Sequence, residues 1–235
     1  MIGRSWLTQP SSAAAGLLFH LMFCAVRLVA ESFGWPFRGR WRPAWAFGLL
    51  VVLFLPLLFV PLLGYAIAAT RAAEVDASAG PPPWRITQGL LLDGVWTSIA
   101  ILLTVAPFAL LLNPLVGVVG ATSLPEPYAH VVALFAVALP WGLVALLHMP
   151  HSTAAYAASS RPRDLFDVRA SLHGVRRDFT TWNLAAAAMV TGWAIGVACV
   201  GLLCVGIVPG IFYAILVSAH ASAALRRPGS RPPAG

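Results

Sequence analysis

Four long apolar runs, separated by polar segments, dominate the pattern of the chain. Each is close to the ~20 residues that a helix needs to cross a ~30 Å hydrocarbon core. The runs lie at 89–112, 128–149, 182–203 and 208–225. The last two belong to one continuous apolar stretch, about twice as long as one crossing needs, and glycine and proline near 203–208 predict the turn between them. The pattern therefore predicts an all-α, polytopic membrane helical bundle with four full spans, forming a single integral membrane domain over 1–235.

A fifth apolar segment, residues 46–69, carries Pro56 and Pro61 near its middle. Proline has no N–H to donate and its ring clashes with the preceding turn, so a helix bends or breaks there. Each half would be about 18 Å long, too short to cross the bilayer alone. We therefore expect a proline-bent, re-entrant hairpin that enters and leaves on one side, with a single continuous crossing as the alternative.

The two ends of the chain differ from its centre. Residues 12–31 are mostly apolar, with one narrow polar stripe at helical spacing that ends in Arg27 and Glu31, an i,i+4 pair. This pattern predicts an N-terminal hydrophobic helix that lies at the membrane interface or packs against a protein partner. Residues 226–235 are basic and rich in proline and glycine, which predicts a mobile tail.

The longest polar stretch, residues 151–181, combines arginines with apolar residues at helical spacing. The apolar residues are Leu165, Val168, Leu172, Val175 and Phe179. This combination predicts a basic amphipathic helix on the membrane surface, and an ordinary solvated loop helix is the alternative.

Charge adds an orientation. All fifteen basic residues are arginines, and the net charge is +7. Because the arginines lie between apolar runs, we expect membrane lipids as their partners and no nucleic acid. If the four spans alternate, ten arginines fall on one side and none on the other, so the positive-inside rule places the 151–181 segment and the C-terminus in the cytoplasm.

Seven arginines are predicted to act as topology signals or lipid anchors, the first three beside Trp35 and Trp41. They are Arg38, Arg40, Arg42, Arg163, Arg169, Arg176 and Arg177. The re-entrant hairpin keeps the first three on the arginine-rich side.

Several short motifs follow one another along residues 36–222. They are Pro36-Phe37, the run from Gly48 to Pro61, Leu63-Gly64-Tyr65, Arg71, Asp93-Gly94, Pro107, and Asp164-Leu165-Phe166-Asp167 before a final apolar hairpin. In this order they resemble the opening and later segments of a prokaryotic multi-pass membrane family called domain of unknown function 4013. The resemblance implies a multi-pass architecture in a prokaryotic cytoplasmic (inner) membrane. It implies no activity, because the family has no established one.

Asp93 is the one carboxylate inside a predicted span, one turn from its start. Intramembrane carboxylates are costly and often functional, so ion or proton handling is one interpretation. The other is a structural role at the helix entry, within reach of water or Arg85.

Two histidines are candidate cofactor ligands. His148 and His220 are predicted to lie at the same membrane boundary, where imidazoles on neighbouring helices could ligate a haem iron or a chlorophyll magnesium. Interfacial histidines are also common without any cofactor.

Two G-x-x-x-G motifs, Gly192 with Gly196 and Gly206 with Gly210, lie in the last apolar hairpin. Small residues let helices approach closely in lipid, either within one chain or against another subunit.

The sequence contains no phosphate-binding glycine loop, zinc-protease motif or nucleophile elbow, and its three cysteines lack metal-site spacing. We therefore expect no enzyme activity and find no motif that implies a cofactor. We expect a non-catalytic accessory or scaffold subunit of a larger membrane protein complex, with other membrane protein subunits as partners. A small transporter or channel is the first alternative. A haem- or chlorophyll-binding subunit of an electron-transfer or light-harvesting complex is the second.

Overall fold

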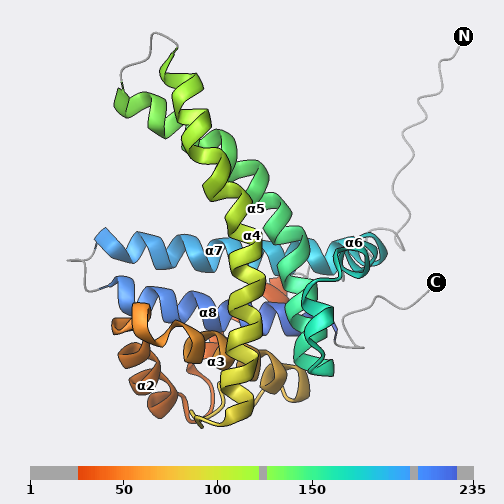
Figure 1. Ribbon diagram of the computed structural model, residues 1–235. Coiled ribbons are helices and arrows are strands. Elements are labelled where there is room, and N and C mark those ends of the chain that lie inside the picture. The colour runs from red at the N-terminus through yellow and green to blue at the C-terminus, as the bar shows by residue number, and fades with distance from the viewer. Residues whose placement is uncertain (1–25, 122–125, 202–205, 227–235) are drawn as a thin grey trace, which may run out of the picture.

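The computed structural model describes residues 26–121, 126–201 and 206–226, which are mostly helical and contain no strand (Figure 1). A helix over residues 26–34 comes first. The elements after it are η1 (Trp35–Phe37), α2 (Trp41–Leu53), α3 (Leu55–Val75), α4 (Gln88–Gly120), α5 (Glu126–Ser159), η2 (Pro162–Leu165), α6 (Val168–Arg177), α7 (Phe179–Ala198), η3 (Cys199–Gly201) and α8 (Ile207–Ala224). The all-α fold class is confirmed.

Five helices of the described residues are long and apolar enough to cross a membrane. They are Leu55–Val75, Gln88–Val119, Tyr128–Ser159, Phe179–Ala198 and Ile207–Ala224. Four correspond to the predicted spans. The fifth, α3, is the second half of the proline-bent segment, which is longer than expected because the helix continues past Ala69 to Val75.

The bend itself is confirmed, although its place differs. The helix breaks at Phe54, the residue between α2 and α3, and Leu58 is a second non-helical position. Pro56 then lies in the first turn of α3, where its missing N–H leaves no intrahelical bond unmade. Proline therefore moves the break to the residues before it.

The two ends of the α2–α3 hairpin lie together. The Arg38 guanidinium donates to the carbonyl of Ala77 at 3.3 Å, and the backbones of Gly39 and Ala79 are in close contact. One end precedes α2 and the other follows α3. This is the arrangement that a re-entrant hairpin requires, whereas its depth in a bilayer stays a prediction.

The largest core cluster joins α2, α3 and α8. Phe212 of α8 is fully buried, and its ring contacts Trp45 edge-on at 5.4 Å and stacks near Tyr65 at 6.0 Å. Gly48 lies directly against this ring, so closely that a Cβ there would stand 2.1 Å from it. Helix α2 can therefore lie on α8 only with glycine at this position.

Glycine also brings α3 and α4 together. A Cβ on Gly64 would stand 2.0 Å from the Leu90 carbonyl oxygen, and a Cβ on Gly94 would stand 2.0 Å from the Val60 carbonyl oxygen. The two backbones are thus in contact at two points about one helix turn apart. This contact sets the position of Asp93, which precedes Gly94.

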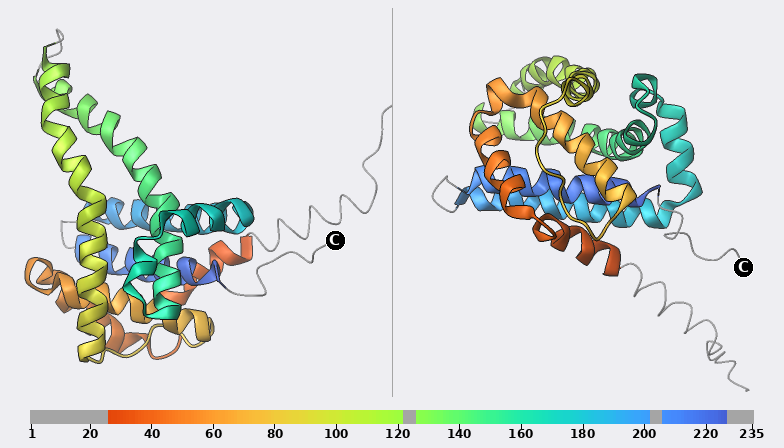
Figure 2. Two further views of the ribbon diagram at one scale, coloured as in Figure 1. Left: turned by 45° about the vertical axis from the view of Figure 1, so that its right-hand side comes forward. Right: turned by 90° about the horizontal axis from the view of Figure 1, so that it is seen from below.

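Helices α7 and α8 lie side by side and antiparallel, and α4 and α5 cross over this pair (Figures 1 and 2). Gly196 and Gly210 meet backbone to backbone inside it, and Gly192 lies against Val217. Gly206 packs on the Cys199 carbonyl. The G-x-x-x-G motifs therefore serve contacts within the chain, and a role in contact with another subunit stays a prediction.

Helices α4 and α5 are longer than the predicted 89–112 and 128–149. Helix α4 has 33 residues, about 50 Å, and absorbs most of the expected loop at 113–127. Helix α5 continues through Pro150 to Ser159. Proline leaves the carbonyl of Leu146 without its helical donor, and the Trp182 indole donates to it at 3.3 Å. A tertiary hydrogen bond thus replaces the local one.

The amphipathic helix of the polar stretch is α6, shorter than the pattern suggested. Asp167 caps its first turn by accepting from the Ala170 N–H, and Asp178 ends it and caps α7. Of the five apolar residues at helical spacing, Leu165 and Val175 are buried in the protein, whereas Val168, Leu172 and Phe179 are exposed. Only part of the apolar pattern therefore faces outward.

Some predictions fall on residues outside those described. Most of the 12–31 helix and most of the 226–235 tail lie there, as does the centre of the 203–208 turn. Within the described part, Arg27 and Glu31 form the expected ion pair at 2.8 Å.

Candidate functional site

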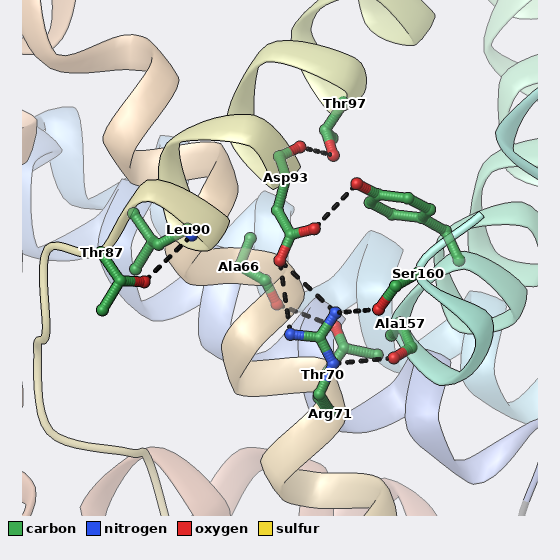
Figure 3. Close-up of polar contacts among 10 residues, drawn as sticks. Ala66, Thr70, Arg71, Thr87, Leu90, Asp93, Thr97, Ala157 and Ser160 are labelled. Atoms are coloured by element: carbon green, nitrogen blue, oxygen red, sulfur yellow. Dashed lines mark hydrogen bonds and ion pairs between the residues drawn. The ribbon is translucent and has the colours of Figure 1, made fainter. Parts of the chain in front are cut away.

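Asp93 lies at the centre of a polar cluster that joins three helices (Figure 3). One carboxylate oxygen accepts a 2.8 Å hydrogen bond from the hydroxyl of Tyr156 on α5. The other accepts from both terminal nitrogens of Arg71 on α3, at 3.3 and 3.4 Å. The sequence analysis expected Arg85 as the nearby cation, and the structure corrects this to Arg71. We call Asp93, Arg71, Tyr156 and Ser160 the Asp93 cluster.

The guanidinium of Arg71 is held from a second direction by the end of α5. Its Nε donates to the Ala157 carbonyl at 2.8 Å, and a terminal nitrogen lies 3.3 Å from the Ser160 hydroxyl. Ser160 itself has a φ of 54°. That left-handed conformation is unusual for serine and costs on the order of 1 kcal/mol. It ends α5 so that the hydroxyl and the Ala157 carbonyl both reach Arg71.

The cluster is a charge pair with nearly all its hydrogen-bonding capacity used. Asp93 is 13% exposed and Arg71 is 39% exposed. A charge leaves water at high cost unless it is paired and hydrogen-bonded, and here each charge has at least two partners. Arginine does not lose its proton in proteins. The arrangement therefore stabilises an ionised carboxylate and links α3, α4 and α5.

A cavity of about 560 Å³ adjoins the cluster. Arg71, Asp93 and Tyr156 form part of its wall, and Arg85 from the loop before α4 forms another part. Apolar and aromatic side chains, among them Trp96, complete it. The volume lies within the ~300–1,000 Å³ range of small-molecule sites.

A second cavity of about 470 Å³ lies among α3, α4, α5, α7 and α8. Its lining is mainly apolar, with hydroxyls such as those of Thr70, Thr97 and Thr153. Each of these three hydroxyls donates to the backbone carbonyl four residues earlier. At these three positions the cavity wall therefore offers hydroxyl oxygens that can accept a hydrogen bond. The hydroxyl protons are already donated to the backbone.

The two candidate ligand histidines have separate surroundings. His148 has both ring nitrogens engaged, with the Ser171 hydroxyl at 3.1 Å and the Leu165 carbonyl at 2.9 Å. His220 is fully buried, 2.9 Å from the Ser32 hydroxyl and in ring contact with Trp35. Since a metal needs a free imidazole lone pair, the contacts of His148 argue against ligation in this conformation. Among the described residues, no group of three or more His, Cys, Asp or Glu side chains is placed to share a metal ion.

The predicted anchor arginines have several settings. Arg38 bonds to Ala77, Arg42 lies over the Trp41 ring, and Arg163 lies 3.8 Å from Asp164. Arg177 lines a polar cleft between α5 and α6. The remaining three, Arg40, Arg169 and Arg176, are exposed. Lipid contact at all seven stays a prediction.

Trp35 precedes the predicted anchor arginines, yet it is completely buried. Other tryptophans use the indole N–H to join elements. Trp45 donates to Pro36, Trp84 to Ala44 and Trp141 to Thr104. Several tryptophans in this chain are therefore interhelical hydrogen-bond donors.

Sequence reasoning found Asp93 but missed both of its partners. Arg71 was one of the motif residues that carried the family resemblance, and that was a usable signal. Tyr156 lies 63 residues from Asp93, and nothing in its sequence surroundings indicates the contact.

One of the comparisons with known proteins found a matching family. The model of a family described as "Protein of unknown function (DUF4013)" matches residues 47–217, well over half of the chain. No curated protein and no solved structure matches the chain. Two dipeptides that carried the resemblance, Gly64-Tyr65 and Asp93-Gly94, contain the two glycines that pack α3 against α4 and the carboxylate of the site. The chain thus belongs to the DUF4013 family of multi-pass helical membrane proteins.

Proposed function

We propose that the chain is a non-catalytic accessory or scaffold subunit of a larger membrane protein complex. The observation that carries this proposal is the apolar surface of the distal arm, which we define as residues 105–120 of α4 and 126–143 of α5. The arm projects away from the rest of the bundle (Figure 1 and the left view of Figure 2). Within an 18-residue apolar stretch of each helix, only 6% of the residues are buried within the chain.

The arm exposes large apolar side chains along its length. Leu110 is 76% exposed on α4, and Leu139 is 69% exposed on α5. Helix α4 is about 50 Å long, whereas the hydrocarbon core is ~30 Å thick. The usual helix tilt of about 20° is too small to make up this difference. Lipid alone therefore leaves part of this apolar surface without cover, and another membrane subunit would cover it.

The experiment compares companions that co-purify in mild detergent. Leu110→Ala and Leu139→Ala truncate the arm, and Leu57→Ala truncates an 82% exposed residue of α3 outside it. We expect the two arm variants to lower the recovery of specific companions several-fold in quantitative mass spectrometry, with Leu57→Ala unchanged. A native protein that runs as a lone monomer, or equal losses in all three variants, contradicts the proposal.

A small transporter is the second candidate, and the position of the Asp93 cluster favours it. The carboxylate of Asp93 lines the 560 Å³ cavity, and Thr97, whose hydroxyl donates to the Asp93 carbonyl, lines the 470 Å³ cavity. An intramembrane charge between two cavities is a common feature of transport pathways. A native protein that runs as a lone monomer would favour the transporter over the accessory subunit. A haem- or chlorophyll-binding role has no comparable support.

A further inference from the structure

We propose that the cavity beside the Asp93 cluster binds the phosphate group of an anionic membrane phospholipid. This inference goes beyond the accessory role and does not depend on it. It starts from the charges of the cavity wall. Arg71 and Asp93 neutralise each other, so the remaining charge of this wall is that of Arg85.

Arg85 is exposed and, across the described residues, no carboxylate lies within ion-pair distance of it. Its guanidinium therefore keeps its five donors for a ligand. Arginine matches a phosphate with two parallel hydrogen bonds, which are among the strongest that a protein forms. A phosphate in the cavity would thus neutralise the one unpaired charge of its wall.

An apolar stripe along α4 distinguishes a lipid from a free phosphate. Leu92 and Trp96 line the cavity, and Ile99 and Leu103 continue from them at helical spacing. Their exposed fractions are 51%, 36%, 36% and 60%. From Leu92 to Leu103 the stripe runs about 16 Å, close to half of a ~30 Å hydrocarbon core. A chain attached to the bound phosphate would lie on this stripe within one leaflet.

The position in the chain agrees with this ligand. Arg85 lies in the 71–88 segment that the arginine distribution places on the cytoplasmic side. Anionic headgroups attract basic residues at that surface. The cavity is therefore expected to face the leaflet that can supply the lipid.

The experiment measures lipid binding to the full, delipidated chain in mild detergent, by native mass spectrometry and thermal shift. The probes are phosphatidylglycerol, phosphatidylcholine with the same chains, and inorganic phosphate. We expect phosphatidylglycerol to bind best. Arg85→Gln should weaken it about tenfold or more, whereas Arg27→Gln, an equal loss of charge at an exposed side chain of the 26–34 helix, should change it less than about twofold.

A second pair of variants tests the stripe. Leu103→Ser should weaken phosphatidylglycerol binding, and Leu102→Ser, an equally exposed neighbour on another face of α4, should not. Binding of inorganic phosphate with the same Arg85 dependence, unaffected by Leu103→Ser, would assign the site to a soluble phosphate. Equal effects of Arg85→Gln and Arg27→Gln, or no preference for the anionic lipid, would overturn the proposal.

Discussion

At the residue scale, the pairing of Asp93 with Arg71 explains how a carboxylate is kept inside a hydrophobic helix. Desolvation opposes both charges. The Tyr156 hydroxyl and the Ala157 carbonyl supply the remaining hydrogen bonds. Because the contacts come from α3, α4 and α5, the pair also links these three helices, which share few other polar contacts.

We expect Asp93→Asn to lower the free energy of unfolding by about 1–3 kcal/mol, because it leaves the Arg71 guanidinium without its counter-charge. Arg71→Gln should have a similar effect. The double variant should be less destabilised than the sum of the two, by about 0.5–3 kcal/mol. Thermal unfolding in detergent measures all three.

Two controls accompany this cycle. Arg27→Gln breaks the exposed pair with Glu31 and should cost less than about 1 kcal/mol. Tyr128→Phe removes an exposed hydroxyl and should be neutral, whereas Tyr156→Phe removes a bond to Asp93 and should cost about 1 kcal/mol. Strict additivity of the Asp93 and Arg71 variants would show that the pair contributes nothing to stability.

At the element scale, glycines decide which helix faces meet. In the α3–α4 contact the backbones themselves touch, at Gly64 and Gly94. Dispersion and weak C–H···O contacts are among the forces that hold helices together in lipid, and both require close approach. The α7–α8 hairpin uses Gly196 and Gly210 in the same way.

We expect Gly94→Ala to destabilise the protein by about 1–3 kcal/mol, because the new methyl would stand 2.0 Å from the Val60 carbonyl oxygen and one helix must shift. Gly117→Ala, in the same helix, meets nothing within 4 Å. It should be neutral or stabilising by up to about 1 kcal/mol, since alanine favours helix. Melting temperatures in one detergent compare the two, and equal effects would mean that the α3–α4 contact is loose.

At the scale of the whole molecule, arginine-bearing ends of several elements meet at one end of the bundle. Arg38 contacts Ala77, Arg71 contacts Ser160, and Arg226 lies 3.2 Å from Glu74. The C-terminal end of α4 and the N-terminal end of α5 lie at the far tip of the arm (Figure 1). The fold thus gathers residues that the positive-inside rule assigns to one side.

We expect single cysteines at Ser78 and Ser159 to react with a membrane-impermeant thiol reagent only from the cytoplasmic face. A cysteine at Ala121, at the end of α4, should react only from the external face. The three native cysteines are replaced beforehand. Labelling of Ser78 and Ser159 from opposite faces would show that α4 and α5 do not both cross, and external labelling of both would invert the topology. A cysteine at Gly34, before α2, that reacts from the face opposite to Ser78 would show that α2–α3 crosses and is not re-entrant.

What could be predicted from the sequence follows from local pattern. Hydrophobic length predicted the four spans, proline predicted the broken segment 46–69, and helical spacing predicted the pair of Arg27 and Glu31. These features depend on residues within one or a few helix turns, where geometry fixes which side chains are neighbours. The family resemblance added the multi-pass architecture, and the match to the family model confirmed the resemblance.

The tertiary structure decided the contacts between distant residues. Arg71 lies 22 residues from Asp93, Tyr156 lies 63 from it, and Ser32 lies 188 from His220. It also decided that Gly196 packs within the chain, that Trp35 is buried, and that α5 continues past a proline. A helix presents several faces of similar hydrophobicity, and local pattern does not say which of them meet. That choice depends on shape and hydrogen bonding across the whole bundle, where a single glycine or carbonyl selects one arrangement over the others.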